Sequence, residues 1–129
     1  MKSCLVVDDS SVVRKIARRI LEELGFSVVE AEDGEQALEL CTKSLPEAIL
    51  LDWNMPVMDG YDFLGRLRRL PGGEGPKVVF CTTENDIDHI SRALNAGANE
   101  YIMKPFDKEI VAAKFQEVGL IQAMSAESA

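Results

Sequence analysis

Residues 48–60 read Ala-Ile-Leu-Leu-Asp-Trp-Asn-Met-Pro-Val-Met-Asp-Gly, an apolar run that stops at a carboxylate. Ala48–Leu51 is apolar at every position, which is the pattern of a strand buried on both faces. The Asn, Pro and Gly residues that follow Asp52 are typical of a loop. The segment therefore predicts a buried strand that carries Asp52 to one edge of a sheet.

Similar short runs recur along the chain and alternate with longer segments of helical spacing. The other predicted strands are Cys4–Val7, Ser27–Ala31, Val78–Cys81 and Tyr101–Met103. The helical segments repeat apolar residues every three or four positions. Helix starts are predicted at Asp33, which with Gln36 resembles a capping box, and near Asp107; Gly25 and Gly97 are predicted helix ends. Five strands alternating with five helices predict an α/β fold with a parallel sheet covered on both faces.

Polar residues follow four of these strands at the points where the strands end. Asp8 and Asp9 follow the first, Asp52 the third, Thr82 and Thr83 the fourth, and Lys104 the fifth. The carboxyl ends of parallel strands meet at one edge of the sheet, which is where open α/β sheets bind their ligands. We therefore expect carboxylates, hydroxyls and an ammonium group to share one crevice.

Three crowded carboxylates repel one another unless they take up protons or share a cation. Mg²⁺ prefers oxygen ligands, including one or two carboxylates and a phosphate, so Asp8, Asp9 and Asp52 predict a magnesium site. The alternative for Asp8 and Asp9 is that they only cap the first helix. The alternative for Thr82 is a β-branched residue that fills the end of its strand.

Composition limits the class of protein. A chain of 129 residues is the size of one domain, and 22 acidic against 14 basic residues give a net charge of −8, which argues against general nucleic-acid binding. The three cysteines form no C-x-x-C pair and are expected to be reduced and buried. No segment resembles a signal peptide or a membrane span, so the expected location is the cytoplasm.

The quoted residues also carry a family resemblance. Val7-Asp8-Asp9, the segment 51–60, Thr82 and the segment 101–106, which reads Tyr-Ile-Met-Lys-Pro-Phe, together resemble a response-regulator receiver domain. The resemblance covers residues 3–118 and implies a flavodoxin-like, doubly wound (βα)5 fold with a five-stranded parallel sheet of order 2-1-3-4-5. It implies a receiver domain over residues 1–124, followed by a short flexible tail over residues 125–129.

The resemblance implies a role for each acidic residue. Asp52 would accept a phosphoryl group from the phosphohistidine of a sensor histidine kinase or phosphotransfer protein. Asp9, Asp52 and the backbone carbonyl of Asn54 would hold Mg²⁺, and Asp8 would act through a bound water.

It also implies roles for residues of the last two strands. Lys104 would contact the phosphoryl group, Thr82 would move toward it, and Tyr101 would swing inward behind Thr82. The peptide bond before Pro105 is expected to be cis.

By the same resemblance, the protein would be a monomeric, stand-alone response regulator that is not an enzyme beyond assisting its own phosphorylation and dephosphorylation. It would signal in chemotaxis or motility through a downstream protein, with the flagellar motor switch as one candidate. A phosphorelay intermediate or phosphate sink is the alternative. The expected output surface is the fourth helix, fifth strand and fifth helix, with Ile87, Ile90, Leu94 and Met103 either docking a partner or facing the core.

Two other classes of protein have weaker support. An aspartyl-phosphate hydrolase would need a second acid two residues after the nucleophile, where this chain has Asn54, and a cap insertion. A flavin-binding electron carrier would need a hydroxyl- and glycine-rich first turn, where this chain has Asp8-Asp9-Ser10-Ser11.

Two features of the helices stay open to interpretation. The basic side of the first helix is either a solvated face or a contact for the kinase or phosphotransfer domain; its residues are Arg14, Lys15, Arg18 and Arg19. His89, the single histidine, is expected to be a surface residue of the fourth helix.

Overall fold

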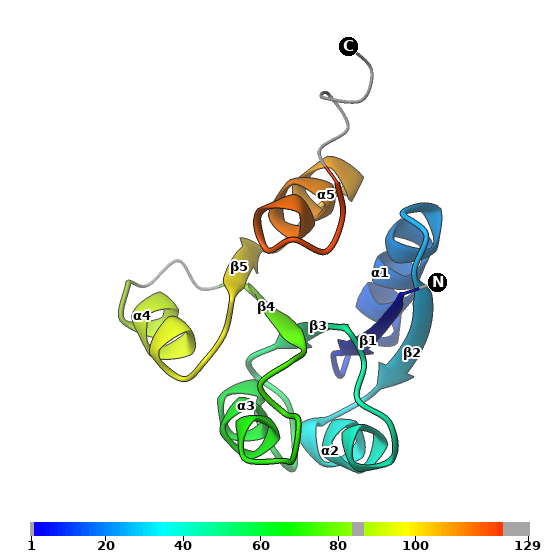
Figure 1. Ribbon diagram of the computed structural model, residues 1–129. Helices are drawn as coiled ribbons and strands as arrows, with labels where there is room; N and C mark the ends of the chain where they lie inside the picture. The colour runs from blue at the N-terminus through cyan, green and yellow to red at the C-terminus, as the bar shows by residue number, and fades with distance from the viewer. Residues whose placement is uncertain (1, 84–86, 123–129) are drawn as a thin grey trace.

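The computed structural model describes residues 2–83 and 87–122, without the side chain of Ile87. Strands and helices alternate throughout (Figure 1). Their bounds are β1 Ser3–Val7, α1 Ser11–Glu23, β2 Ser27–Ala31, α2 Gly34–Lys43, β3 Ala48–Asp52, α3 Gly60–Arg68, β4 Lys77–Thr82, α4 Ile87–Asn95, β5 Glu100–Met103 and α5 Lys108–Glu117.

All five strands are parallel, and their order is β2-β1-β3-β4-β5. The predicted fold class and strand order are therefore confirmed. The predicted tail, residues 125–129, lies outside the described residues. Within the described residues no helix is both long and apolar enough to cross a membrane.

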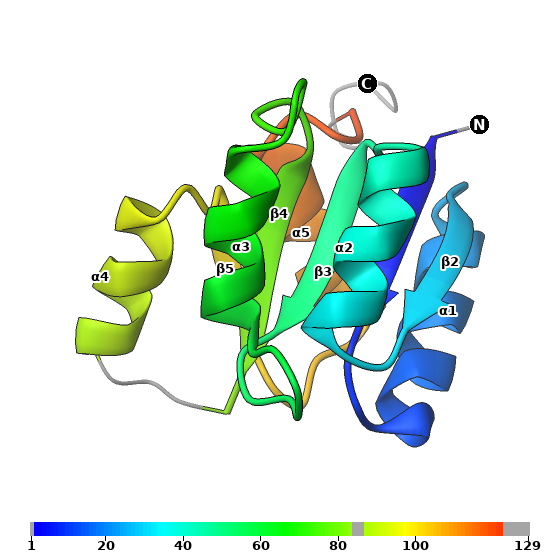
Figure 2. The ribbon, with the colours of Figure 1, turned by 90° about the horizontal axis from the view of Figure 1, so that it is seen from below.

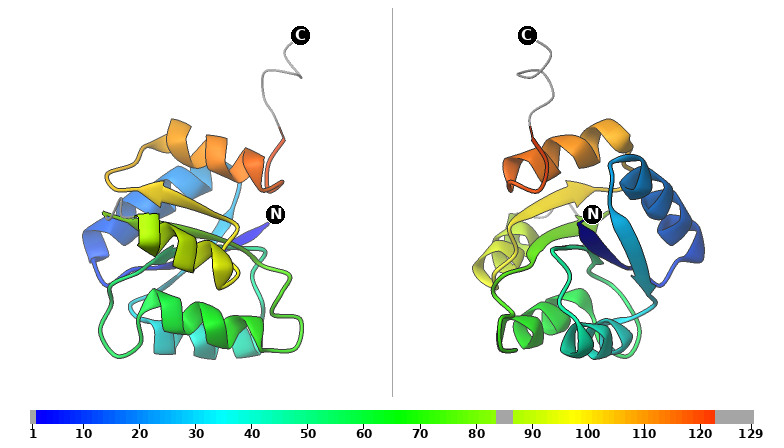
Figure 3. Two further views of the ribbon diagram at one scale, coloured as in Figure 1. Left: turned by 90° about the vertical axis from the view of Figure 1, so that its left-hand side faces the viewer. Right: turned by 45° about the vertical axis from the view of Figure 1, so that its right-hand side comes forward.

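Helices cover both faces of the sheet. Helices α1 and α5 lie on one side, and α2, α3 and α4 lie on the other (Figures 1 and 3). Alternate residues of β1 supply the two cores, because successive side chains of a strand point to opposite faces. Cys4 and Val6 pack with α1 and α5, whereas Leu5 and Val7 pack with α2 and α3. All three cysteines are buried and free, as expected.

The helix boundaries follow the local signals in the sequence. Asp33 and Asp107 are N-caps whose side chains accept hydrogen bonds from backbone N–H groups three residues later. Gly25 and Gly97 end helices α1 and α4 in the left-handed region, with φ of 96° and 112°, which glycine adopts at little cost. These four predictions are confirmed.

The parallel register aligns the carboxyl ends of the inner strands. Asp52 pairs with Cys81, and Thr82 pairs with Met103, so β3, β4 and β5 end at neighbouring points. Figure 2 shows the arrowheads of β3 and β4 pointing to the same edge. The loops that leave this edge carry the candidate site.

Arg68, at the end of α3, joins two connections at the opposite edge of the sheet. Its guanidinium donates to the backbone carbonyls of Gly73 and Pro76, each at 2.9 Å, and to that of Gly97 at 2.6 Å. Burial lowers the pKa of Arg68, although nearby Glu74 acts in the opposite direction. Arg68 thereby satisfies carbonyls of the segment before β4 and of the turn after α4.

We predict that Arg68→Ala lowers the free energy of unfolding by about 2–4 kcal/mol, because several partly buried carbonyls lose a charged donor. Arg69→Ala is the matched control, since Arg69 is exposed and adjacent, and it should change stability by less than about 0.5 kcal/mol. Urea unfolding of both variants measures the difference. Equal stability of the two variants would contradict the role given to Arg68.

Candidate functional site

An acidic cluster lies at the carboxyl ends of β1 and β3. Asp8, Asp9 and Asp52 each offer a carboxylate oxygen, and these oxygens lie within 4.8 Å of one another. Asp8 and Asp52 are buried, at 2% and 7% exposure, whereas Asp9 is exposed. The structure thus brings together the three acids that the sequence predicted to share a crevice.

Lys104 supplies the positive charge of the cluster. Its Nζ lies 2.8 Å from Asp8 Oδ2 and 3.2 Å from Asp52 Oδ1, so one ammonium group joins acids from two strands. Burial acts to lower the pKa of Lys104, but the hydrogen bond to Asp8 and the charge of Asp52 outweigh it and the pKa is raised. Lys104 therefore stays charged and is held in place at physiological pH.

Asp52 remains difficult to ionise despite Lys104. Burial and the nearby charge of Asp8 raise its pKa to about 6, against the lowering effect of Lys104. Its Oδ1 also accepts a hydrogen bond of 2.9 Å from the backbone N–H of Trp53. A group that removes negative charge from the crevice would favour the ionised form of Asp52.

The loop after β3 folds back closely on the strand. The N–H of Gly60 donates to the Trp53 carbonyl at 2.8 Å, and a Cβ at Gly60 would overlap the carbonyl oxygen of Asp52. The N–H of Gly34, at the start of α2, donates to the Met58 carbonyl at 3.0 Å. Glycine at position 60 is therefore required for α3 to start directly beneath Asp52.

Val57, in the same loop, has a φ of 69°. A β-branched residue in the left-handed region is unfavourable by about 1–2 kcal/mol. The sequence carries no signal for this strain. The hydrogen bonds from Gly34 to Met58 and from Gly60 to Trp53 hold the loop on either side of Val57.

The other predicted site residues lie at or near the same edge. Thr82 is buried at the end of β4, and its carbonyl accepts from the N–H of Lys104 at 2.9 Å. Asn54 is exposed two residues after Asp52. Tyr101 is half-buried on β5, with the ammonium of Lys114 at 5.2 Å from its ring centroid. The peptide bond between Lys104 and Pro105 is cis, as expected.

The alternative in which Asp8 and Asp9 cap the first helix is wrong. Ser10 is the N-cap of α1, and its side chain accepts from the N–H of Val13 at 3.2 Å. Asp8 instead turns back, accepting from the N–H of Ser10 at 2.9 Å while it contacts Lys104. The side chains of Asp8 and Asp9 therefore lie with Asp52 in the acidic cluster, and neither caps the helix.

The chemistry of the donor set fits a hard divalent cation. Three carboxylates face a single ammonium among the described residues, which leaves an excess of two negative charges when all are ionised. Carboxylate oxygens are the ligands that Mg²⁺ takes, and Asp9 and Asn54 are exposed at the mouth of the site. Asp8, Asp9 and Asp52 are the side chains that could hold it.

An aromatic cluster behind the acidic loop was not foreseen. The Trp53 ring stacks on the Tyr61 ring with 5.4 Å between the ring centroids, and it makes an edge contact with His89 at a centroid distance of 4.7 Å. The guanidinium of Arg92 lies 4.7 Å from the Tyr61 ring centroid. His89 is thus half-buried against Trp53 rather than a simple surface residue, because α4 packs over the loop that follows Asp52. A tryptophan directly after the acid was the only available signal.

Comparison with known proteins assigns the class. The family model of the response regulator receiver domain matches residues 4–116. The chain therefore belongs to the response regulator receiver domain family.

Particular relatives are chemotaxis proteins. The chain is 40% identical to a chemotaxis protein CheY homolog of Campylobacter jejuni, over 88% of this chain and 89% of that protein. It is 38% identical to chemotaxis protein CheY1 of Helicobacter pylori, over 88% of this chain and 94% of that protein.

A solved structure supports the same class. Chemotaxis protein CheY4 of Vibrio cholerae superposes with a TM-score of 0.87 at 31% identity, covering 92% of this chain and 98% of that chain. A chain from the crystal structure of the CheX-CheY-BeF3-Mg²⁺ complex of Borrelia burgdorferi superposes with a TM-score of 0.85 at 27% identity, covering 91% of this chain and 88% of that chain.

We predict that Asp52→Asn stabilises the metal-free protein at pH 8. The folded-state pKa of about 6 lies above the ordinary 3.8, so stability from this carboxyl is lost as pH rises between these values. The difference corresponds to a gain of about 3 kcal/mol for the Asn variant at pH 8, which should vanish near pH 4. Urea unfolding in the presence of a chelator measures both values.

Asp62→Asn provides the control for this experiment. Asp62 is exposed on α3, and its carboxylate forms a salt bridge with Arg66 at 3.5 Å. Its removal should change stability by less than about 0.5 kcal/mol at either pH. An Asp52→Asn variant that is no more stable than wild type at pH 8 would show that folding does not raise the pKa of the Asp52 carboxyl.

Proposed function

We propose that this protein is a response regulator that accepts a phosphoryl group on Asp52 and signals by phosphorylation-dependent protein binding. The observation that carries the proposal is the pairing of one Lys104 ammonium with both Asp8 and Asp52 inside the acidic cluster. That arrangement holds a carboxylate nucleophile next to a fixed positive charge and next to oxygens suited to a divalent cation.

The proposed transfer uses few protein groups. A carboxylate oxygen of Asp52 attacks the phosphorus of a phosphohistidine, the P–N bond breaks, and the imidazole leaves with its electron pair. Mg²⁺ would neutralise negative charge on the phosphoryl oxygens. Lys104 moves from balancing Asp52 to balancing a phosphoryl oxygen, and water later attacks phosphorus to release phosphate and restore the carboxylate.

Release of the Lys104 contact gives a route to switching. Thr82 ends β4 and Lys104 follows the adjacent strand β5, and the backbone N–H of Lys104 donates to the Thr82 carbonyl. A phosphoryl group that contacts both side chains would therefore shift the conformational equilibrium of these two linked strand ends together. Tyr101 reports that change from β5. The Lys114 ammonium lies 5.2 Å from the Tyr101 ring centroid and 3.5 Å from Glu100 Oε1. A movement of Tyr101 would therefore change the position of Lys114 at the surface.

The surface of α4, β5 and α5 is the proposed output site. Leu94 is 43% exposed there, and Ile90 and Met103 are half-buried. The relatives support a role in chemotaxis, with a histidine kinase or phosphotransfer protein as donor and a downstream protein as receiver. We place this exchange in the cytoplasm, with the flagellar motor switch as one candidate receiver; a phosphorelay intermediate or phosphate sink is the alternative.

We predict one acid-stable, base-labile phosphate after incubation with acetyl phosphate and Mg²⁺. Asp52→Asn should abolish the label, because the nucleophile is lost, whereas Asp62→Asn should be labelled as the wild type is. Intact-protein mass spectrometry measures the added phosphate. Full labelling of the Asp52→Asn variant would overturn the assignment of the acceptor.

We also predict that beryllofluoride with Mg²⁺ shifts the Tyr101 signal in ¹⁹F NMR of 3-fluorotyrosine-labelled protein. Tyr61, the other tyrosine, identifies the signals through a Tyr61→Phe variant. Thr82→Ala should bind beryllofluoride but lose most of the Tyr101 shift, and Thr82→Ser, which keeps the hydroxyl, should retain it. An undiminished shift in Thr82→Ala would remove Thr82 from the switch.

A further inference from the structure

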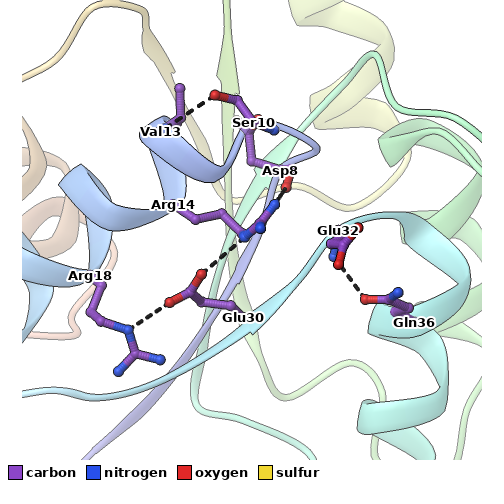
Figure 4. A network of polar contacts seen from close by, with 8 residues as sticks. All are labelled: Asp8, Ser10, Val13, Arg14, Arg18, Glu30, Glu32 and Gln36. Atoms are coloured by element: carbon purple, nitrogen blue, oxygen red, sulfur yellow. Dashed lines mark hydrogen bonds and ion pairs between the residues drawn. The ribbon is translucent and has the colours of Figure 1, made fainter.

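Arg14 lies behind the acidic loop and outside the proposed phosphoryl chemistry. Its Nη1 donates to the backbone carbonyl of Asp8 at 2.6 Å, and its Nε donates to Glu30 Oε1 at 2.9 Å (Figure 4). The side chain is only 13% exposed although it is charged. A guanidinium in this position can act on the loop only through the backbone that it contacts.

The Asp8 backbone is held on both sides. Its N–H donates to the Ala31 carbonyl of β2 at 3.1 Å, and its own carbonyl accepts from Arg14. That carbonyl belongs to the planar peptide joining Asp8 to Asp9, so Arg14 fixes the plane from which Asp9 projects. The exposed Asp9 carboxylate makes no side-chain hydrogen bond among the described residues, so the backbone sets its position.

Glu30, on edge strand β2, holds Arg14 in turn. Its Oε2 accepts from Arg18 Nε at 2.6 Å while Oε1 accepts from Arg14 (Figure 4). The hydrogen bond from Arg18, followed by that from Arg14, lowers the pKa of Glu30 despite some burial. Two arginines of the basic side of α1 are therefore engaged within the protein rather than simply solvated.

We infer that Arg14 is a positioning residue for the cation site: it orients the peptide between Asp8 and Asp9 and thereby strengthens Mg²⁺ binding. The inference rests on the proposed binding of Mg²⁺ by the acidic cluster. A guanidinium acting only as a nearby positive charge would do the reverse, because like charges repel. The sign of the change in Mg²⁺ affinity therefore distinguishes positioning from bare charge.

The experiment is a Mg²⁺ titration by isothermal calorimetry of the full chain at constant ionic strength. Arg14→Gln should raise the Kd by about tenfold or more, the effect typical of losing a residue that orients metal ligands. Arg14→Lys should also weaken binding, since it keeps the charge but cannot donate to the carbonyl and to Glu30 with one planar fork. Circular dichroism checks that each variant is folded.

Arg18→Gln is the matched control. It removes the other guanidinium on Glu30, with no contact to Asp8, and should leave the Kd within about twofold of wild type. A weakening that is confined to Arg14 would support an orienting role.

Two results would overturn the inference. Wild-type affinity or tighter binding in Arg14→Gln, with Mg²⁺ still bound by the wild type, would overturn the inference alone. Absence of Mg²⁺ binding in the wild type would overturn it together with the proposed function. If Arg14→Gln does not fold, the Arg14→Lys variant decides, because unchanged affinity there would exclude orientation by the guanidinium fork.

Discussion

The contact of the Lys104 ammonium with Asp8 and Asp52 is the interaction on which the rest of the site depends. It joins the ends of β1, β3 and β5, and without it two buried carboxylates would face each other across one crevice. The neutralisation is incomplete, because the pKa of Asp52 is still raised to about 6. Lys104 therefore allows the acidic residues to be buried together, but it does not balance all of their negative charge.

The loops around this contact are fixed from behind. Gly60 lets α3 begin under Asp52, Arg14 holds the Asp8 carbonyl, and the Trp53 ring packs against α4. Each of these contacts acts on backbone or on apolar surface rather than on the crevice itself. The elements that hold these loops therefore lie on both sides of the sheet, with α1 on one side and α3 and α4 on the other.

Local signals were sufficient for most of the fold. Apolar runs, cap residues such as Asp33 and left-handed glycines such as Gly25 act over a few residues, so a pattern in the chain predicts them directly. The meeting of the acids at one edge was equally predictable from the sequence, since the carboxyl ends of parallel strands lie at the same edge of a sheet. The Arg14–Glu30 pair and the contact of His89 with Trp53 were not, because each joins residues that come together only after the helices pack.

The sequence by itself determined the alternation of strands and helices and the edge that carries Asp8, Asp9, Asp52, Thr82 and Lys104, since these follow from residue type and strand order. Only the tertiary structure decided that Ser10 rather than Asp8 caps α1, that Lys104 spans two of the acids, and that Arg14 grips the Asp8 peptide. The physical reason is range: caps and periodicity are local, whereas a hydrogen bond between distant side chains depends on where packing places both partners.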